Sequence, residues 1–296
     1  MFRTMVETDL DRILTCLDIP SVNTTTRQRF VDYLRTGAYR PEWTWLALDG
    51  DEIAGLAVWW GFPAGDRPLA LDALYAAPSV ADPIPLWTSL IERVPPPVEY
   101  HIFVLPDGRD DPEIAARLAA AAAAGLSTLT ERFRYEWTPA ITLPPRSKRL
   151  TFTAEPDDEA FIDVFQRISD GSLDVATRAG VARLGARAYA EQDVADYTMM
   201  PGPRQLWRPA HDTAGELVGC ALPSANDGGP VVGYLGVVPA HRGHGYVDDL
   251  LAEITWLLAE RGASSIRADT DSTNTPMATA FERAGYRMFA IRLVAS

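Results

Sequence analysis

The sequence is poor in the residues that build disulfides and metal sites. It contains two cysteines, Cys16 and Cys220, which lie far apart in the chain, and four histidines without metal-site spacing. We therefore expect neither a disulfide framework nor a bound metal. Because Cys220 stands in an apolar run with no histidine near it in sequence, we expect its thiol to be buried.

Long apolar segments are also missing. The N-terminus has no apolar signal-peptide core, and no uninterrupted apolar run is long enough to span a membrane. These absences predict a cytoplasmic protein with no membrane contact. The chain has 27 Lys and Arg against 40 Asp and Glu, and its formal net charge of −13 argues against nucleic acid as a partner. The composition leaves monomer and homodimer both open.

The composition is that of globular domains. Of the 296 residues, 47% are hydrophobic and 23% are charged. The polar, proline-rich stretch at residues 144–149 is typical of a linker. On each side of it the pattern predicts the same order: helices, hairpin, strand, turn, helix, strand, helix and strand. We therefore predict two domains, 1–145 and 150–296, each of the α/β class with a mixed sheet.

Local signals predict several individual elements. Asp49-Gly50-Asp51 predicts the turn of a hairpin over residues 43–60. Asp111-Pro112 predicts the start of a helix, because Asp caps helices and Pro fits the first helical position. Residues 177–192 are expected to contain a helix, which Gly180 and Gly185 would weaken.

The most informative stretch joins a strand at residues 231–238 to a helix. A polar turn, Arg242-Gly243-His244-Gly245, precedes apolar residues that recur at helical spacing over 247–258, with Gly262 as the expected C-terminal cap. The first amides of a helix have no partner inside it and carry partial positive charge. Glycines let a diphosphate approach the backbone, and Arg242 adds a cation, so this is a candidate anion site. The alternative is a tight turn that uses glycine for geometry alone.

The first half lacks these features at the corresponding place. Leu74-Tyr-Ala-Ala-Pro78 stands where Leu235-Gly-Val-Val-Pro239 stands in the second half. Residues 79–85, which follow, contain no glycine and no arginine, and their prolines lack the amides that a phosphate needs. We infer that only the second half keeps an anion-binding turn.

Two sequence blocks resemble the acetyl-CoA motifs of the GNAT superfamily of N-acyltransferases. Residues 237–251 are similar to the family's strand, Arg/Gln-x-x-Gly-x-Gly/Ala turn and helix. Asn274-Thr-Pro-Met277, with Phe281 and Gly285-Tyr286, is similar to its second block. The whole chain resembles an actinobacterial tandem GNAT protein with a degenerate N-terminal half, which implies two GNAT-like domains in tandem.

The resemblance also implies how acetyl-CoA is held as a co-substrate. The backbone of one strand would pair with the pantetheine arm like an added strand, at Leu235, Gly236, Val237 and Val238. Amides of the turn and the helix start would hold the diphosphate, at Arg242, Gly243, His244, Gly245, Tyr246 and Val247. Asn274 would lie near the thioester, and Phe281 would pack against the cofactor arm.

Four positions depart from the family pattern. Val247 stands where Gly or Ala is usual. Asp248 and Asp249 put negative charge into the first helical turn, which costs about 1 kcal/mol against a phosphate at an exposed, screened site. Phe281 replaces the tyrosine with which many members reprotonate the leaving thiolate.

The candidate catalytic residues are Asp271, Asp269 and Tyr234. The two aspartates alternate with Ala268 and Thr270 on one strand, so they face the same side and are suited to binding an amine or accepting a proton. The alternatives are a pair of solvated acids at a strand end, or a cap by Asp271 on the loop that leads to Asn274. Tyr234 is the candidate acid, with packing on the sheet as its alternative.

The leading functional hypothesis is an acetyl-CoA-dependent N-acetyltransferase. The amine of an unidentified small molecule attacks the thioester directly, and amides near Val237 polarise the carbonyl. One alternative is a non-catalytic protein that binds acyl-CoA or another small molecule. A third is a structural pseudo-enzyme without affinity for CoA.

Overall fold

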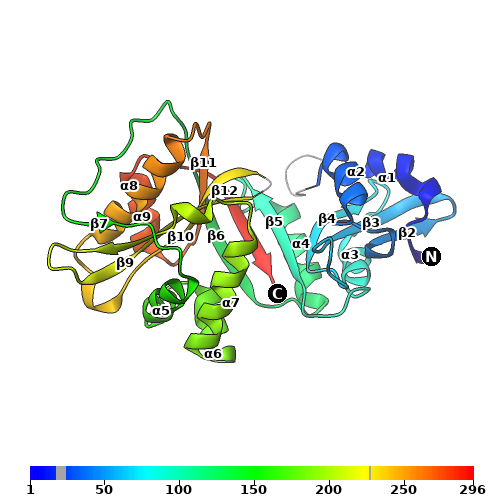
Figure 1. Ribbon diagram of the computed structural model, residues 1–296. Coiled ribbons are helices and arrows are strands. Elements are labelled where there is room, and N and C mark those ends of the chain that lie inside the picture. Colours follow the sequence, from blue (N-terminus) through cyan, green and yellow to red (C-terminus); the bar gives the residue numbers. More distant parts are fainter. Residues whose placement is uncertain (18–24, 227) are drawn as a thin grey trace. The chain divides into compact units, whose positions relative to one another are not determined.

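The computed structural model describes residues 1–17, 25–226 and 228–296 (Figure 1). The chain divides into two compact units: unit 1 comprises Met1–Arg132 and Ala290–Ser296, and unit 2 comprises Phe133–Phe289. Each unit combines helices with a sheet of parallel and antiparallel strands, which confirms the predicted α/β class. Within the described residues, no helix is both long enough and apolar enough to cross a membrane.

Unit 1 has the strand order β1-β2-β3-β4-β5-β12. Its elements are β1 (Phe2–Thr4), α1 (Leu10–Cys16), α2 (Arg27–Thr36), β2 (Thr44–Asp49), β3 (Glu52–Trp60), β4 (Ala70–Ala76), α3 (Ile84–Ile91), β5 (Glu99–Val104) and α4 (Pro112–Ala123). β4 is antiparallel to β3 and parallel to β5. The last strand of the chain, β12 (Arg287–Ala295), adds its final residues antiparallel to β5.

Two local predictions for unit 1 are confirmed. Gly50 adopts a φ of 57° in the turn that joins β2 to β3. Asp111 caps α4, where its carboxylate accepts a hydrogen bond from the Glu113 amide at 2.8 Å and Pro112 follows it. The short strand β1 was not predicted, because its three residues are too few to show a period.

Unit 2 has the strand order β6-β11-β10-β9-β8-β7. Its elements are β6 (Leu129–Trp137), β7 (Thr151–Phe152), α5 (Asp158–Ser169), α6 (Val175–Leu184), α7 (Ala186–Met199), β8 (Arg208–His211), β9 (Leu217–Asn226), β10 (Gly229–Val237), α8 (Tyr246–Ala259), β11 (Ile266–Asp271) and α9 (Thr275–Arg283). β10 is antiparallel to β9 and parallel to β11. Unit 2 thus repeats the arrangement that surrounds β4 in unit 1.

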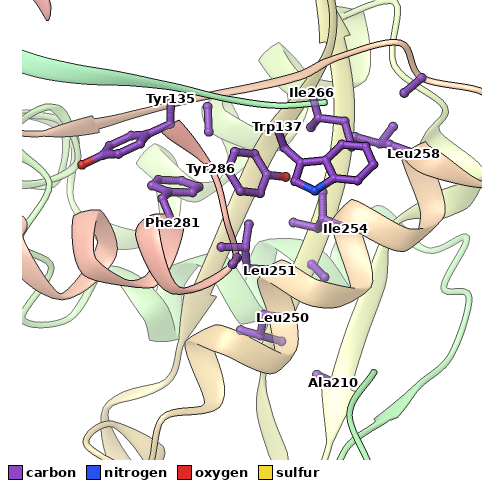
Figure 2. Packing of buried hydrophobic residues seen from close by; sticks show 14 of the residues in the cluster. Tyr135, Trp137, Ala210, Leu250, Leu251, Ile254, Leu258, Ile266, Phe281 and Tyr286 are labelled. Atoms are coloured by element: carbon purple, nitrogen blue, oxygen red, sulfur yellow. The ribbon is translucent and has the colours of Figure 1, made fainter. Parts of the chain in front are cut away.

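Helices form two separate cores on the sheet of unit 2. One core holds α8 and α9, where Leu251, Ile254 and Phe281 pack beneath Trp137 and Tyr286 (Figure 2). The other core holds α5 and α7 with β9 and β10, and its members are Phe161, Val164, Phe165, Ile168, Ala190, Val194, Trp207, Cys220, Leu222 and Val238. β10 therefore has a helical layer on each side.

The helix predicted within residues 177–192 is present, but it is divided in two. The structure has two helices there, α6 and α7, which meet at Gly185. Gly185 has a φ of 84°, which side chains resist. Gly180 of α6 lies so close to the ring of Tyr189 that a Cβ would overlap it. The two glycines thus create a bend and a close contact between helices instead of weakening one helix.

The segment 144–149 lies within unit 2 and runs alongside helix α8, the orange helix of Figure 1. The indole nitrogen of Trp256 donates to the Pro144 carbonyl at 2.8 Å. Arg146 forms an ion pair with Glu260 at 2.7 Å. These contacts fasten the segment to the C-terminal half of α8.

Candidate functional site

Strand β10 lies between β11 and β9 in the sheet of unit 2. Among the described residues, one pair of Cα partners joins β10 to β11. This pair is Val231 and Arg267, near the start of both strands. All nine residues of β10 are partly exposed, although it has a neighbouring strand on each side. In unit 1 the corresponding β4 is buried at five of its seven residues. The backbone of β10 beyond Val231 is therefore accessible to an extended ligand.

A bulge at Gly233 determines which side chains flank this strand. The pairing with β9 changes register between Val232 and Tyr234. As a result Val232 and Leu235 both pack against the α8 core, while Tyr234 packs against the core of α5 and α7. A bulge disrupts the ladder locally and re-aims side chains, as is common beside functional sites.

The four positions predicted to pair with pantetheine are not equivalent. Leu235, Gly236 and Val237 are partly exposed. Val238 is buried, and its amide donates to the Val218 carbonyl at 2.9 Å. A Cβ at Gly236 would overlap Ile168 of α5, so glycine at this position serves helix packing.

In the turn after β10, two glycines precede the start of helix α8. Gly243 and Gly245 have φ values of 82° and 71°, which L side chains rarely adopt. Nothing lies within 4 Å of the place where a Gly243 Cβ would stand, so backbone conformation rather than space requires this glycine. Helix α8 begins at Tyr246 without a side-chain cap, which leaves its first amides to other partners. His244 is exposed, and Tyr246 and Val247 are partly exposed.

The C-terminal end of α8 follows its prediction. Gly262 has a φ of 83°, and its amide donates to the Ala259 carbonyl at 2.9 Å. This confirms the predicted glycine cap.

Arg242 makes contacts that its sequence position did not reveal. Its Nε donates to the Val237 carbonyl at 3.0 Å, its Nη1 to the Gly171 carbonyl at 3.2 Å and its Nη2 to the Ile168 carbonyl at 2.8 Å. These bonds fasten the turn to the end of α5. A contact between Arg242 and phosphate stays a prediction.

The two aspartates after the turn are each matched by an arginine. Asp248 pairs with Arg283 of α9 at 2.6 Å, and Asp249 pairs with Arg149 at 2.6 Å. Each negative charge is thus compensated by a neighbour. This reduces the competition with phosphate that the sequence suggested.

In the second motif block, the Asn274 side chain is partly exposed and Phe281 is a core residue. Asn274 precedes α9, and its side chain makes no capping hydrogen bond. Phe281 is 1% exposed; its ring stacks on Tyr135 with centroids 5.1 Å apart, and Tyr286 lies at 5.5 Å (Figure 2). The contacts of both residues with a cofactor stay predictions.

The two predicted catalytic aspartates have protein partners. Asp269 pairs with Arg134 of β6 at 3.1 Å. Asp271 is buried, and its Oδ2 accepts a hydrogen bond from the Val175 amide at 2.6 Å, at the first residue of α6. Asp271 therefore anchors α6 to the end of β11. Whether either carboxylate also accepts a proton from a substrate stays a prediction.

Tyr234 lies in an aromatic cluster on the other side of β10. Its ring stacks on Phe165 with centroids 4.1 Å apart, and Tyr197 lies at 6.0 Å. Burial raises the pKa of the Tyr234 phenol well above its ordinary value, so the phenol keeps its proton at neutral pH.

The sequence analysis did not single out Asp193 of α7, which lies near this cluster and adds to the rise in the Tyr234 pKa. Burial raises the pKa of Asp193 to about 7, against the lowering effect of a hydrogen bond with Tyr189. Two further acids act in the same direction as burial, Asp196 and Asp174. The available signal was the spacing of Tyr189, Asp193 and Tyr197, which puts all three on one face of a helix.

Metal ligands and reactive thiols do not gather in the described part of the chain. No group of three or more His, Cys, Asp or Glu side chains there could hold a metal ion. Cys16 and Cys220 are buried and free, as predicted for Cys220. Burial raises the pKa of the Cys220 thiol, which keeps it protonated.

Comparison with known proteins agrees with the geometry around β10 and α8. Residues 182–286, which include both elements and Asn274, match the model of the acetyltransferase (GNAT) family. This match supports acyl transfer as the class of reaction, in agreement with the predicted GNAT-type acetyltransferase. The search of curated proteins found no match.

Solved structures show that the similarity in fold extends over the whole chain. A GCN5-related N-acetyltransferase from Sphaerobacter thermophilus has a TM-score of 0.62 at 16% identity, covering 99% of this chain and 94% of that one. A tandem GNAT protein from the clavulanic acid biosynthesis pathway, without acetyl-CoA, has a TM-score of 0.56 at 18% identity, covering 100% of this chain and 98% of that one. The predicted tandem GNAT fold is thereby confirmed.

Proposed function

We propose that this protein transfers an acetyl group from acetyl-CoA to the amine of a small molecule. The observation that carries the proposal is the partly exposed strand β10, followed by the glycine turn at the start of α8, inside the GNAT-matched residues. An extended pantetheine arm can pair with such a strand, and a diphosphate suits the amides of a helix N-terminus. Asn274, whose side chain makes no capping bond, is available near the end of this path.

The proposed reaction is direct attack of a neutral amine on the thioester. The amine nitrogen forms a bond to the carbonyl carbon, the carbon–sulfur bond breaks, and the thiolate of CoA leaves. The amine proton passes to a carboxylate, and the thiolate takes a proton from an acid. Backbone amides of β10 near the Gly233 bulge and Val237 are suited to stabilising the oxyanion.

Asp193 and Tyr234 fit the two proton-transfer roles. A carboxyl group with a pKa of about 7 changes charge near neutral pH, which suits a general base. The Tyr234 phenol keeps its proton and is therefore suited to donate one. Asp269 is the other candidate base, although it pairs with Arg134.

Titration calorimetry with acetyl-CoA tests the cofactor site. We expect the wild-type protein to bind, and we expect Gly245→Ala to weaken binding about tenfold or more. An L side chain carries about 1–2 kcal/mol of strain in this left-handed conformation and stands in the path of the diphosphate. Release of thiol in the presence of a panel of amines then distinguishes a transferase from a protein that only binds CoA.

Gly262 provides the matched control. It lies just beyond the other end of α8, and its φ of 83° resembles the 71° of Gly245. Gly262→Ala should lower the melting temperature by a similar amount and leave the affinity for acetyl-CoA unchanged. Absence of binding by the wild-type protein at about 1 mM acetyl-CoA, a limit that corresponds to about −4 kcal/mol, would refute the proposal.

A further inference from the structure

An arginine from outside the GNAT-matched residues lies on the turn before α8. Arg149 ends the segment 144–149, whose start is bonded to Trp256 near the C-terminal end of α8. The guanidinium of Arg146 lies 4.5 Å from the centre of a ring of Trp256 and also pairs with Glu260. These contacts direct the segment along α8 toward the helix N-terminus.

The Arg149 side chain contacts three residues at that N-terminus: Asp249, His244 and Tyr246. Its Nε and Nη2 donate to one oxygen of Asp249 at 3.0 and 2.6 Å, and its Nη1 donates to the His244 carbonyl at 2.8 Å. The guanidinium carbon lies 4.3 Å from the centre of the Tyr246 ring. Nη2 lies 3.7 Å from the point where a Gly245 Cβ would stand. The guanidinium is therefore fixed beside the glycine whose conformation opens the helix.

Arg149 has donors to spare in this position. A guanidinium carries five N–H groups. Within the described residues, Arg149 donates three hydrogen bonds, two of them to one carboxylate oxygen of Asp249 and one to the His244 carbonyl. Its side chain is 47% exposed, whereas Asp249 beneath it is 13% exposed. Arg242 is also exposed and also uses all three nitrogens, but its bonds go to the backbone carbonyls of Val237, Gly171 and Ile168. Arg149 differs in that its side chain is held by a carboxylate of α8 and lies beside Gly245.

We infer that Arg149 binds the diphosphate of the CoA substrate and that Asp249 positions it there. The inference rests on the proposed function. Charge-assisted hydrogen bonds from a guanidinium to phosphate are among the stronger polar contacts in proteins. A carboxylate in the first turn of α8, which repels phosphate in isolation, becomes useful when it orients the cation that attracts phosphate.

The test is titration of wild-type and variant proteins with CoA and with 3′-dephospho-CoA. We expect Arg149→Ala to lower the affinity for both ligands by about tenfold or more, because both carry the diphosphate. Arg149→Lys should lose less, because it keeps the charge but not the planar fork. Thermal melting should show little change, since the ion pair is half-exposed.

Arg283 is the matched control. It pairs with Asp248 on the same helical turn at 2.6 Å and is 50% exposed, and its Nε and Nη2 both donate to Asp248. Arg283→Ala should lower the affinity for CoA by no more than about threefold, because it only leaves the charge of Asp248 uncompensated at an exposed site. Equal losses in Arg149→Ala and Arg283→Ala would indicate a general effect of charge and would overturn the inference.

Two other outcomes also decide the question. A loss seen with CoA but not with 3′-dephospho-CoA would place Arg149 at the 3′-phosphate and overturn the assignment to the diphosphate. Wild-type binding that Arg149→Ala leaves unchanged would refute this inference alone. Failure of the wild-type protein to bind CoA would refute the proposed function together with it.

Discussion

At the scale of single residues, Asp193 links stability to pH. Burial raises the pKa of this carboxyl from 3.8 to about 7, so the folded state favours the neutral form. The folded protein therefore binds more protons than the unfolded chain between these two values, and stability falls as pH rises through that window. The groups that face Asp193 are the phenols of Tyr189 and Tyr234 and the carboxylates of Asp174 and Asp196.

Asp193→Asn should accordingly stabilise the protein above pH 7. We expect a gain on the order of 1–2 kcal/mol, less than the full shift implies because the group is only partly buried. The gain should grow from pH 4 to pH 7 and stay constant above, as measured by urea unfolding at several pH values. If Asp193 is the base, the same variant should also lower kcat/KM about 100-fold and remove its rise near pH 7.

Asp196 serves as the control for this prediction. It is exposed on the same helix, and its charge contributes to the raised pKa of Asp193. Asp196→Asn should keep the activity and move the midpoint of the rate profile to slightly lower pH. A stability gain in Asp193→Asn that does not depend on pH would contradict the proposed burial of this carboxyl.

At the scale of elements, the two corresponding strands β4 and β10 differ in what their backbones contact. In unit 1, Arg117 of α4 is 2% exposed and donates to the Leu74 carbonyl of β4 at 2.8 Å. It also donates to the Tyr100 hydroxyl at 3.0 Å and to Glu113 at 2.7 Å. A side chain of unit 1 thus occupies strand backbone of the kind that we propose binds pantetheine in unit 2. This is consistent with the absence of a CoA motif in the first half.

Arg117→Ala should therefore destabilise unit 1 without affecting CoA binding. It removes the buried guanidinium that donates to the Leu74 carbonyl and the Tyr100 hydroxyl, and we expect a loss of about 2–4 kcal/mol in urea unfolding. Arg109, which pairs with Glu131 at 2.9 Å and is 32% exposed, is the control in the same unit. Arg109→Ala should cost less than about 1 kcal/mol. A weaker affinity for CoA in Arg117→Ala would show that unit 1 takes part in binding.

The sequence predicted most of these helices, strands and turns, but not the side-chain contacts around the candidate site. The hairpin at Gly50, the start of α4 and the glycine cap of α8 all depend on neighbouring residues, so their signals are local. The bend at Gly185 was missed because a glycine inside a helical pattern does not reveal its φ. The role of Arg149 was hidden by a composition typical of linkers, since the contacts that hold the segment come from α8, about 100 residues later.

At the scale of the whole molecule, unit 1 is assembled from both ends of the chain. Residues 291–295 of β12 pair with β5, and Thr128 and Ser296 exchange two hydrogen bonds of 2.9 Å. Leu293 is fully buried, as are Tyr100 and Ile102 of β5 beside it. Because β5 lacks this neighbouring strand until residues 291–295 are present, unit 1 cannot complete its sheet before that segment has been made.

A chain that ends at Phe289 should therefore lose the structure of unit 1, although it lacks only seven residues from the far end of the sequence. Hydrogen exchange of the β5 amides, Glu99–Val104, measures this directly, and we expect their protection to fall toward that of exposed loops. The point variant Leu293→Ala should act in the same direction and cost about 2–5 kcal/mol. Met288→Ala, in the same strand but 38% exposed, should change stability by less than about 0.5 kcal/mol. Undiminished protection of β5 in the shortened chain would show that the first 132 residues fold without the C-terminal strand.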